Sequence, residues 1–191
     1  MRQVYMLFIF LSSVFLSSLF YGCNSQQNEG DIWPLAVGNQ WIYKTSEKIN
    51  EKTVIDTVTV TRDTLINGEK WFYTNHSAHP ISWILKNKPD GLYIIDREKN
   101  SPFIFLKYKA KKDETYFNMI DTILVKQVDK VIKTDAGTFT CYQYNALKAD
   151  RDQFLTDDGI YATPGVGVVR FQTTGMWSIK YELIKFNVKS K

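Results

Sequence analysis

The sequence predicts an all-β protein, an antiparallel meander of about ten strands curled into a partly open barrel. From Gln40 onward, short runs rich in Val, Ile, Thr, Tyr, Phe and Trp alternate with turn residues at fairly even intervals. Apolar residues in this part rarely recur at helical spacing. Tight turns join the runs one after another, whereas parallel pairing would need long crossover connections.

Each run is bounded by turn chemistry, so the strands can be assigned in order. We expect them at residues 40–47, 53–66, 70–75, 81–86, 92–96, 103–108, 120–133, 138–147, 167–173 and 177–188. Residues 152–155 and 160–162 are candidates for two shorter strands.

Several turns fix which strands are neighbours. Asn67-Gly68 is the strongest hairpin signal, because both residues tolerate the positive φ of a type I′ turn. Pro89 suits a type I turn that a glycine bulge at Gly91 would close. Residues 135–137 and 173–175 can reverse the chain in the same way.

The number of strands bears on the shape of the sheet. Accumulated twist curls a ten-stranded meander into a barrel or splits it into a sandwich. In the last strand the apolar residues change face near Leu183, which predicts a β-bulge there. Bulges bend strands around curved sheets, so we favour the barrel, with a β-sandwich as the alternative.

The N-terminus predicts an export signal. Arg2 precedes a charge-free apolar run over residues 6–20, shorter than the roughly 20 residues that cross a bilayer. Gly22-Cys23 resembles the lipobox of bacterial lipoproteins, whose cysteine is acylated, for example with palmitate. We therefore assign residues 1–22 to a lipoprotein signal peptide, 23–31 to a lipid-anchored polar tether and 32–191 to a single antiparallel β domain. An uncleaved anchor helix is the alternative.

Both alternatives place the β domain outside the cytoplasm. Asn24, where aspartate commonly signals inner-membrane retention, favours the outer membrane or its periplasmic side. The 191 residues carry a net charge of +4, with basic and acidic side chains interspersed. Nucleic-acid binding would need a basic stripe, so no nucleic-acid partner is expected.

Few residues are suited to catalysis or metal binding. His76 and His79 are predicted to be solvent-exposed loop residues, since two ligands alone rarely hold zinc. Four aspartates within residues 150–158 make a weak calcium site a hypothesis to test. Cys141 alternates with Phe139 on one strand face and is expected to be buried. We predict no catalytic residues, no metal ligands and no cofactor.

Three segments span the start, middle and end of the mature chain: 34–43 (PLAVGNQWIY), 136–142 (AGTFTCY) and 161–169 (YATPGVGVV). They resemble the PLxVGNxWxY, AGTFxCY and YxAPGVGxV segments of uncharacterised lipoproteins from Bacteroidetes-type bacteria, with Thr163 where alanine is common. The resemblance implies a secreted, lipid-anchored β domain and implies no activity.

These observations favour a non-catalytic envelope protein, not an enzyme. Aromatic residues make up 15% of the chain, and residues 103–106 are apolar on both strand faces. Because the mouths of β-barrels are common ligand sites, we expect a lipid or small apolar ligand on a concave surface. The candidate ligand-binding residues are Trp41, Tyr43, Trp71, Trp83 and Phe105.

Two other functions remain open. One is an envelope scaffold or accessory subunit that acts through an envelope protein partner, in addition to membrane attachment through Cys23. The less favoured one is a hydrolase, which a polar cleft with a His–carboxylate pair would support.

Overall fold

The structure, a computed structural model, describes residues 31–47, 52–80, 82–96, 101–118, 121–147, 159–173 and 178–189. The predicted signal peptide, the lipidation site Cys23 and the tether up to residue 30 lie outside the described residues. So does the aspartate-rich segment 150–158, with its calcium hypothesis and the strand candidate 152–155.

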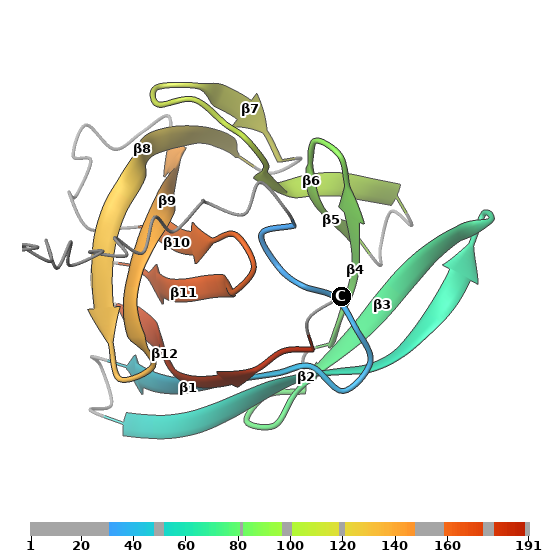
Figure 1. Cartoon of the computed structure of the whole chain (residues 1–191), viewed down its shortest axis with the longest axis horizontal. Coiled ribbons are helices and arrows are strands. Elements are labelled where there is room, and N and C mark those ends of the chain that lie inside the picture. The colour runs from blue at the N-terminus through green and yellow to red at the C-terminus, as the bar shows by residue number, and fades with distance from the viewer. Residues whose placement is uncertain are drawn as a thin grey trace, which may run out of the picture.

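The described residues form one antiparallel sheet of twelve strands that wraps into a nearly closed barrel (Figure 1). The strands are β1 Gln40–Glu47, β2 Lys52–Ile66, β3 Glu69–His76, β4 Ser82–Lys88, β5 Gly91–Asp96, β6 Ser101–Lys107, β7 Thr115–Phe117, β8 Thr122–Thr134, β9 Gly137–Leu147, β10 Gly159–Thr163, β11 Gly167–Gln172 and β12 Ile179–Asn187. Their spatial order runs β6-β5-β4-β3-β2-β1-β12-β11-β10-β9-β8-β7. The all-β meander and its closure into a barrel are confirmed.

Local sequence signals account for most of these strands and their turns. Asn67 and Gly68 have φ values of 51° and 78°, as the predicted type I′ turn requires. In β12 the register passes from Lys185 to Leu183 opposite consecutive residues of β1, so the predicted bulge lies at the intervening residue. β10 extends the short candidate at 160–162, whereas the three-residue β7 was not predicted.

The prediction of a β-bulge at Gly91 is wrong. Gly91 pairs directly with Lys88 across a two-residue turn, and its φ is not positive. Glycine suits this position for another reason, because a Cβ atom there would lie 2.6 Å from the carbonyl oxygen of Leu106. The residue allows β5 and β6 to approach closely.

The barrel has one seam, between the edge strands β6 and β7, where no backbone ladder forms. Two tyrosines bridge it. The Tyr116 hydroxyl donates to the carbonyl oxygen of Phe105 at 2.9 Å, and the Tyr144 hydroxyl donates to that of Lys107 at 2.7 Å. Side-chain hydrogen bonds therefore hold together the two edges that the backbone leaves unpaired.

The two ends of the barrel differ. At one end, named here the turn end, short connections at 67–68, 89–90, 135–136 and 164–166 join the strands. At the other, the loop end, the connections include 48–51, 97–100, 119–120, 148–158 and 174–177, which lie outside the described residues.

The segment before β1 enters the barrel from the turn end and lies among the strands (Figure 1). Ile32, Trp33 and Leu35 are at most 5% exposed and belong to the main hydrophobic core. Two hydrogen bonds fix the segment, from the Asn87 side-chain amide to Trp33 O at 2.9 Å and from the Gly165 N–H to Asp31 O at 3.0 Å. The segment that precedes β1, which is not part of the sheet, therefore fills part of the barrel interior.

Candidate functional site

The barrel interior contains an apolar cavity of about 270 Å³. Its walls are almost entirely aromatic or aliphatic and come from eight different strands and the N-terminal segment. The lining residues are Trp33, Tyr43, Val58, His76, Trp83, Phe105, Ile160, Val168, Phe171 and Tyr181.

The exposure of the lining residues increases towards the loop end. The deeper walls of the cavity include Trp33, Tyr43 and Val58, each at most 3% exposed. By contrast, Ile160, Phe171 and Tyr181 form one row across β10, β11 and β12 near the loop end, and all three are partly exposed. An apolar ligand would enter past this row, which we call the mouth.

Aromatic contacts organise one wall around Trp83. Its ring centroid lies 6.1 Å from that of Trp33 and 6.2 Å from that of Phe105. The imidazole of His76 packs edge to face on Trp83, with centroids 4.8 Å apart. Three segments distant in sequence thus fix the position of one indole beside the cavity.

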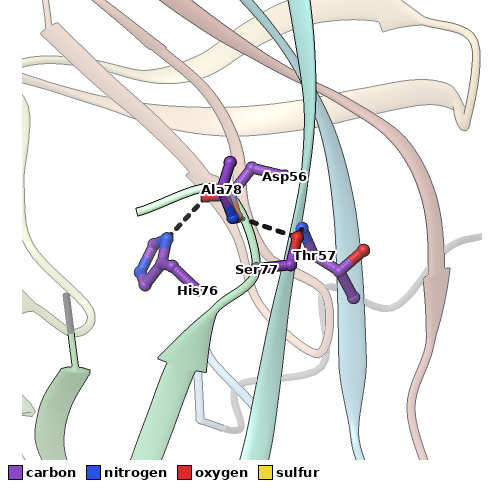
Figure 2. Close-up of polar contacts among 5 residues, drawn as sticks. All are labelled: Asp56, Thr57, His76, Ser77 and Ala78. Atoms are coloured by element: carbon purple, nitrogen blue, oxygen red, sulfur yellow. Dashed lines mark hydrogen bonds and ion pairs between the residues drawn. The ribbon is translucent and has the colours of Figure 1, made fainter. Parts of the chain in front are cut away.

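A buried carboxylate holds the His76 ring. Asp56 Oδ2 lies 2.6 Å from His76 Nδ1, and the Asp56 side chain is fully buried. The other oxygen, Oδ1, accepts hydrogen bonds from the Ala78 N–H at 3.0 Å and from the Ser77 hydroxyl at 3.4 Å. Figure 2 shows Asp56 on β2 between the imidazole and the turn that follows β3. Asp56 therefore orients both the ring and the turn.

The hydrogen bonds of Asp56 keep it ionised. Burial alone would raise the pKa of this carboxyl, but the hydrogen bonds from the Ala78 N–H and from His76 hold the pKa below its ordinary value. An ionised carboxylate only accepts hydrogen bonds, so the proton of the shared bond sits on His76 Nδ1.

Tyr43 lies beside the Asp56–His76 pair, but its hydroxyl already makes a hydrogen bond within the protein. Burial, followed by the nearby charge of Asp56, raises the pKa of Tyr43 well above its ordinary value. The hydroxyl donates to the carbonyl oxygen of Val168 at 2.9 Å. Tyr43 thus remains neutral, and its side chain forms part of the cavity wall.

The structure brings together three of the five predicted ligand-binding residues: Tyr43, Trp83 and Phe105 line the cavity. Trp41 shares the inner face of β1 but does not line the cavity. It packs edge to face against Trp33, with centroids 5.3 Å apart, and is completely buried.

Trp71 also does not line the cavity. It lies five residues from His76 along β3, and residues an odd number apart point to opposite faces of a strand. The sequence did not identify Trp33, whose Asp-Ile-Trp-Pro context carries no strand periodicity.

The expectation that both histidines are solvent-exposed is wrong. The His76 side chain is 6% exposed, and Nε2 of both His76 and His79 is buried. Burial follows from the Asp56 contact, which joins residues twenty positions apart on neighbouring strands. Among the described residues, no group of three His, Cys, Asp or Glu side chains is placed to hold a metal ion.

No nucleophile lies at the cavity among the residues that the structure describes. Cys141 is buried, as predicted, and its Sγ lies 3.1 Å from the Thr163 hydroxyl. Burial raises the pKa of this thiol to about 11. Neither Cys141 nor any serine or threonine is among the lining residues.

Comparison with known proteins identifies the fold. No protein-family model and no curated protein sequence matches the chain. The crystal structure of a "putative lipoprotein" from Parabacteroides distasonis superposes with a TM-score of 0.50 and 12% sequence identity, covering 83% of this chain and 99% of that one. A "putative exported protein" from Bacteroides fragilis, described as having a YmcC-like fold, matches with a TM-score of 0.47 and 10% identity over the same shares.

The first of these similarities establishes a shared fold and nothing further about activity. Across the described ranges, no helix has the length and apolar character needed to cross a bilayer.

Proposed function

We propose that this chain is a non-catalytic, lipid-anchored envelope protein that binds a small apolar ligand inside its barrel. The observation that carries the proposal is the cavity itself. It is an apolar space of about 270 Å³, lined almost entirely by aromatic and aliphatic side chains. Apolar surface left in contact with water costs free energy, which an apolar ligand would recover by displacing that water.

The volume limits the size of the ligand. An apolar cavity of about 150 Å³ holds one benzene molecule, so about 270 Å³ accommodates a chain or ring system of roughly ten to twelve carbon atoms. A diacyl phospholipid is too large to enter whole. The proposed ligand is therefore a medium-length chain, or one such segment of a larger lipid that protrudes through the mouth.

Two further observations support the envelope part of the proposal. The sequence predicts an export signal that ends at Gly22-Cys23. The fold is shared with a protein described as a "putative lipoprotein". Attachment at Cys23 to the outer membrane or its periplasmic side remains a proposal, and the intact mass of the membrane-purified protein tests it. A thioether-linked lipid on a chain that begins at residue 23 is the expected result.

Native mass spectrometry tests ligand binding. We expect the detergent-free chain from residue 24 to retain a co-purifying apolar molecule, or to bind added 1-decanol. Val168→Phe places a ring into the cavity wall and should abolish binding. Val131→Phe makes the same change at a site that is 64% exposed on β8 and should bind normally.

An empty cavity under all of these conditions would contradict the proposal. It would favour the alternative, an envelope scaffold that acts through protein contacts.

The Asp56–His76 pair supports a second candidate, a hydrolase in which His76 activates water. Such a site also needs hydrogen-bond donors for the developing oxyanion. Apart from His76, the polar groups of the described lining residues are two tyrosine hydroxyls and two indole N–H groups, and the Tyr43 hydroxyl is bonded to Val168 O. We therefore rank this function second. Release of p-nitrophenol from p-nitrophenyl esters, lost in His76→Phe, would establish it.

A further inference from the structure

His76, a residue of the cavity wall, carries a buried polar atom that has no hydrogen-bond partner among the described residues. His76 Nε2 is buried, and His76 lines the cavity. The nitrogen lies on the side of the ring away from the bond to Asp56 (Figure 2). Leaving such a group buried and unsatisfied costs free energy, about 1–3 kcal/mol in typical proteins. A ligand that supplied the missing partner would recover that cost.

The Asp56 contact determines what that partner must be. Because the ionised carboxylate fixes a proton on Nδ1, the neutral form of the ring presents its lone pair at Nε2. A lone pair accepts a hydrogen bond from an O–H group. It can also take the proton of a carboxylic acid, after which the imidazolium pairs with the carboxylate on one side and with Asp56 on the other.

The other polar groups of the cavity wall are less suited to this role, because the indole N–H groups of Trp33 and Trp83 only donate hydrogen bonds, and Tyr181 already makes an interaction of its own. The Tyr43 hydroxyl is bonded to Val168 O. Trp33 Nε1 lacks a hydrogen-bond partner, but this edge of the indole packs on Gly167, where a Cβ atom would lie 3.1 Å from it. His79 Nε2 is buried and unpaired as well, but His79 does not line the cavity.

We infer that the ligand carries one proton-donating head group, a carboxyl or a hydroxyl, that binds His76 Nε2, with an apolar body of about ten carbons in the cavity. This inference rests on the proposed function and narrows it from any apolar molecule to medium-chain carboxylic acids and alcohols. Asp56 acts as a positioning residue, since it sets the tautomer of His76 and does not line the cavity.

The head group can be tested with three ligands of nearly equal size. Decanoic acid and 1-decanol each carry an O–H group, whereas methyl nonanoate, an isomer of decanoic acid, does not. The full chain is placed in phospholipid nanodiscs, and each affinity is measured by tryptophan fluorescence, since Trp33 and Trp83 line the cavity. Binding is corrected for partition into empty nanodiscs. We expect the acid, the alcohol or both to bind about tenfold or more tightly than the ester.

Two histidine variants form a matched pair. His76→Phe removes Nε2 while keeping an aromatic ring beside Trp83, so the three ligands should bind with equal affinity. His79→Phe removes the other buried imidazole, which is not part of the cavity wall, and should keep the preference. If His76 had only a structural role, His76→Phe would weaken the binding of all three ligands equally. The preference for the O–H ligands over the ester would then be unchanged.

The outcomes separate this inference from the proposed function. Whichever O–H ligand is preferred over the ester identifies the head group. If the unmodified chain bound all three ligands with equal affinity, and Val168→Phe abolished that binding, the head-group inference would be overturned. The proposal that the cavity binds an apolar ligand would stand. No binding of any of the three ligands would overturn both.

Discussion

The indole of Trp33 packs directly on Gly167, so that a Cβ atom at this position would lie 2.9 Å from Trp33 Cδ1. Gly167 also has a φ of 108°, which side chains rarely adopt. We therefore expect Gly167→Ala to lower the free energy of unfolding by about 2–4 kcal/mol, from overpacking and backbone strain together. Urea denaturation measures the change.

Gly165 provides the control for this substitution. Its φ of 78° is also left-handed, but no atom lies within 4 Å of the added Cβ. Gly165→Ala should therefore cost only the backbone strain, about 1 kcal/mol. Equal losses for the two variants would show that the contact with Trp33 does not constrain the barrel.

Asp56→Asn should destabilise the fold at neutral pH, because the buried carboxylate accepts three hydrogen bonds. We expect a loss of about 1–3 kcal/mol in the free energy of unfolding at pH 7. Asp63 is the control. It pairs with Lys70 on the surface, where both side chains are at least 40% exposed, so Asp63→Asn should have little effect.

The destabilisation by Asp56→Asn should depend on pH. The pKa of Asp56 is lower in the folded chain than in the unfolded chain, so ionised Asp56 stabilises the fold above its ordinary pKa. That stability is lost as the pH falls through the lowered pKa. The difference between the two proteins should therefore shrink from about pH 5 towards pH 2. A difference that stayed constant over this range would show that the charge of Asp56 is not involved.

The seam should loosen when its tyrosine hydrogen bonds are removed. Tyr116→Phe leaves the carbonyl oxygen of Phe105 without its donor and should cost about 1 kcal/mol. Amide hydrogen exchange should become faster in β6 and stay unchanged in β2, which is paired on both sides. Phe117→Ala, at a 64% exposed site on the same edge strand, should leave the exchange of β6 unaltered.

Thiol reactivity tests both the core and the lipid anchor. The pKa of Cys141, raised by burial to about 11, and its lack of exposure predict negligible reaction with a thiol reagent at pH 8 in the folded protein. In urea, membrane-purified protein should show one reactive thiol. Two would mean that Cys23 carries no lipid, and reaction without denaturant would contradict the buried position of Cys141.

Much of the barrel could be predicted because its signals are local. The type I′ turn needs only Asn67 and Gly68, and the bulge in β12 follows from the change of apolar face near Leu183. Strand β7 escaped prediction because three residues are too few to show alternation. The prediction of a bulge at Gly91 was wrong because glycine is needed there for the close contact with β6. A contact with another strand cannot be recognised from the residues of the turn alone.

The candidate site was predicted only in part, for the same reason. Tyr43, Trp83 and Phe105 were identified as aromatic residues in strands, but their convergence depends on how the sheet closes. The burial of His76 could not be predicted from its neighbours in sequence, since its partner Asp56 lies on another strand. Trp33 precedes the first strand, where strand periodicity gives no information.

The attachment of the N-terminal segment bears on how the barrel would be oriented on a membrane. Asp31 is held beside Gly165 at the turn end and lies eight positions after Cys23, a reach of at most about 29 Å. With lipid on Cys23, this tether would hold the turn end within that distance of the bilayer surface. The mouth residues lie nearer the opposite end of the barrel, so a ligand entering past them would come from the aqueous side and not directly from the anchoring leaflet.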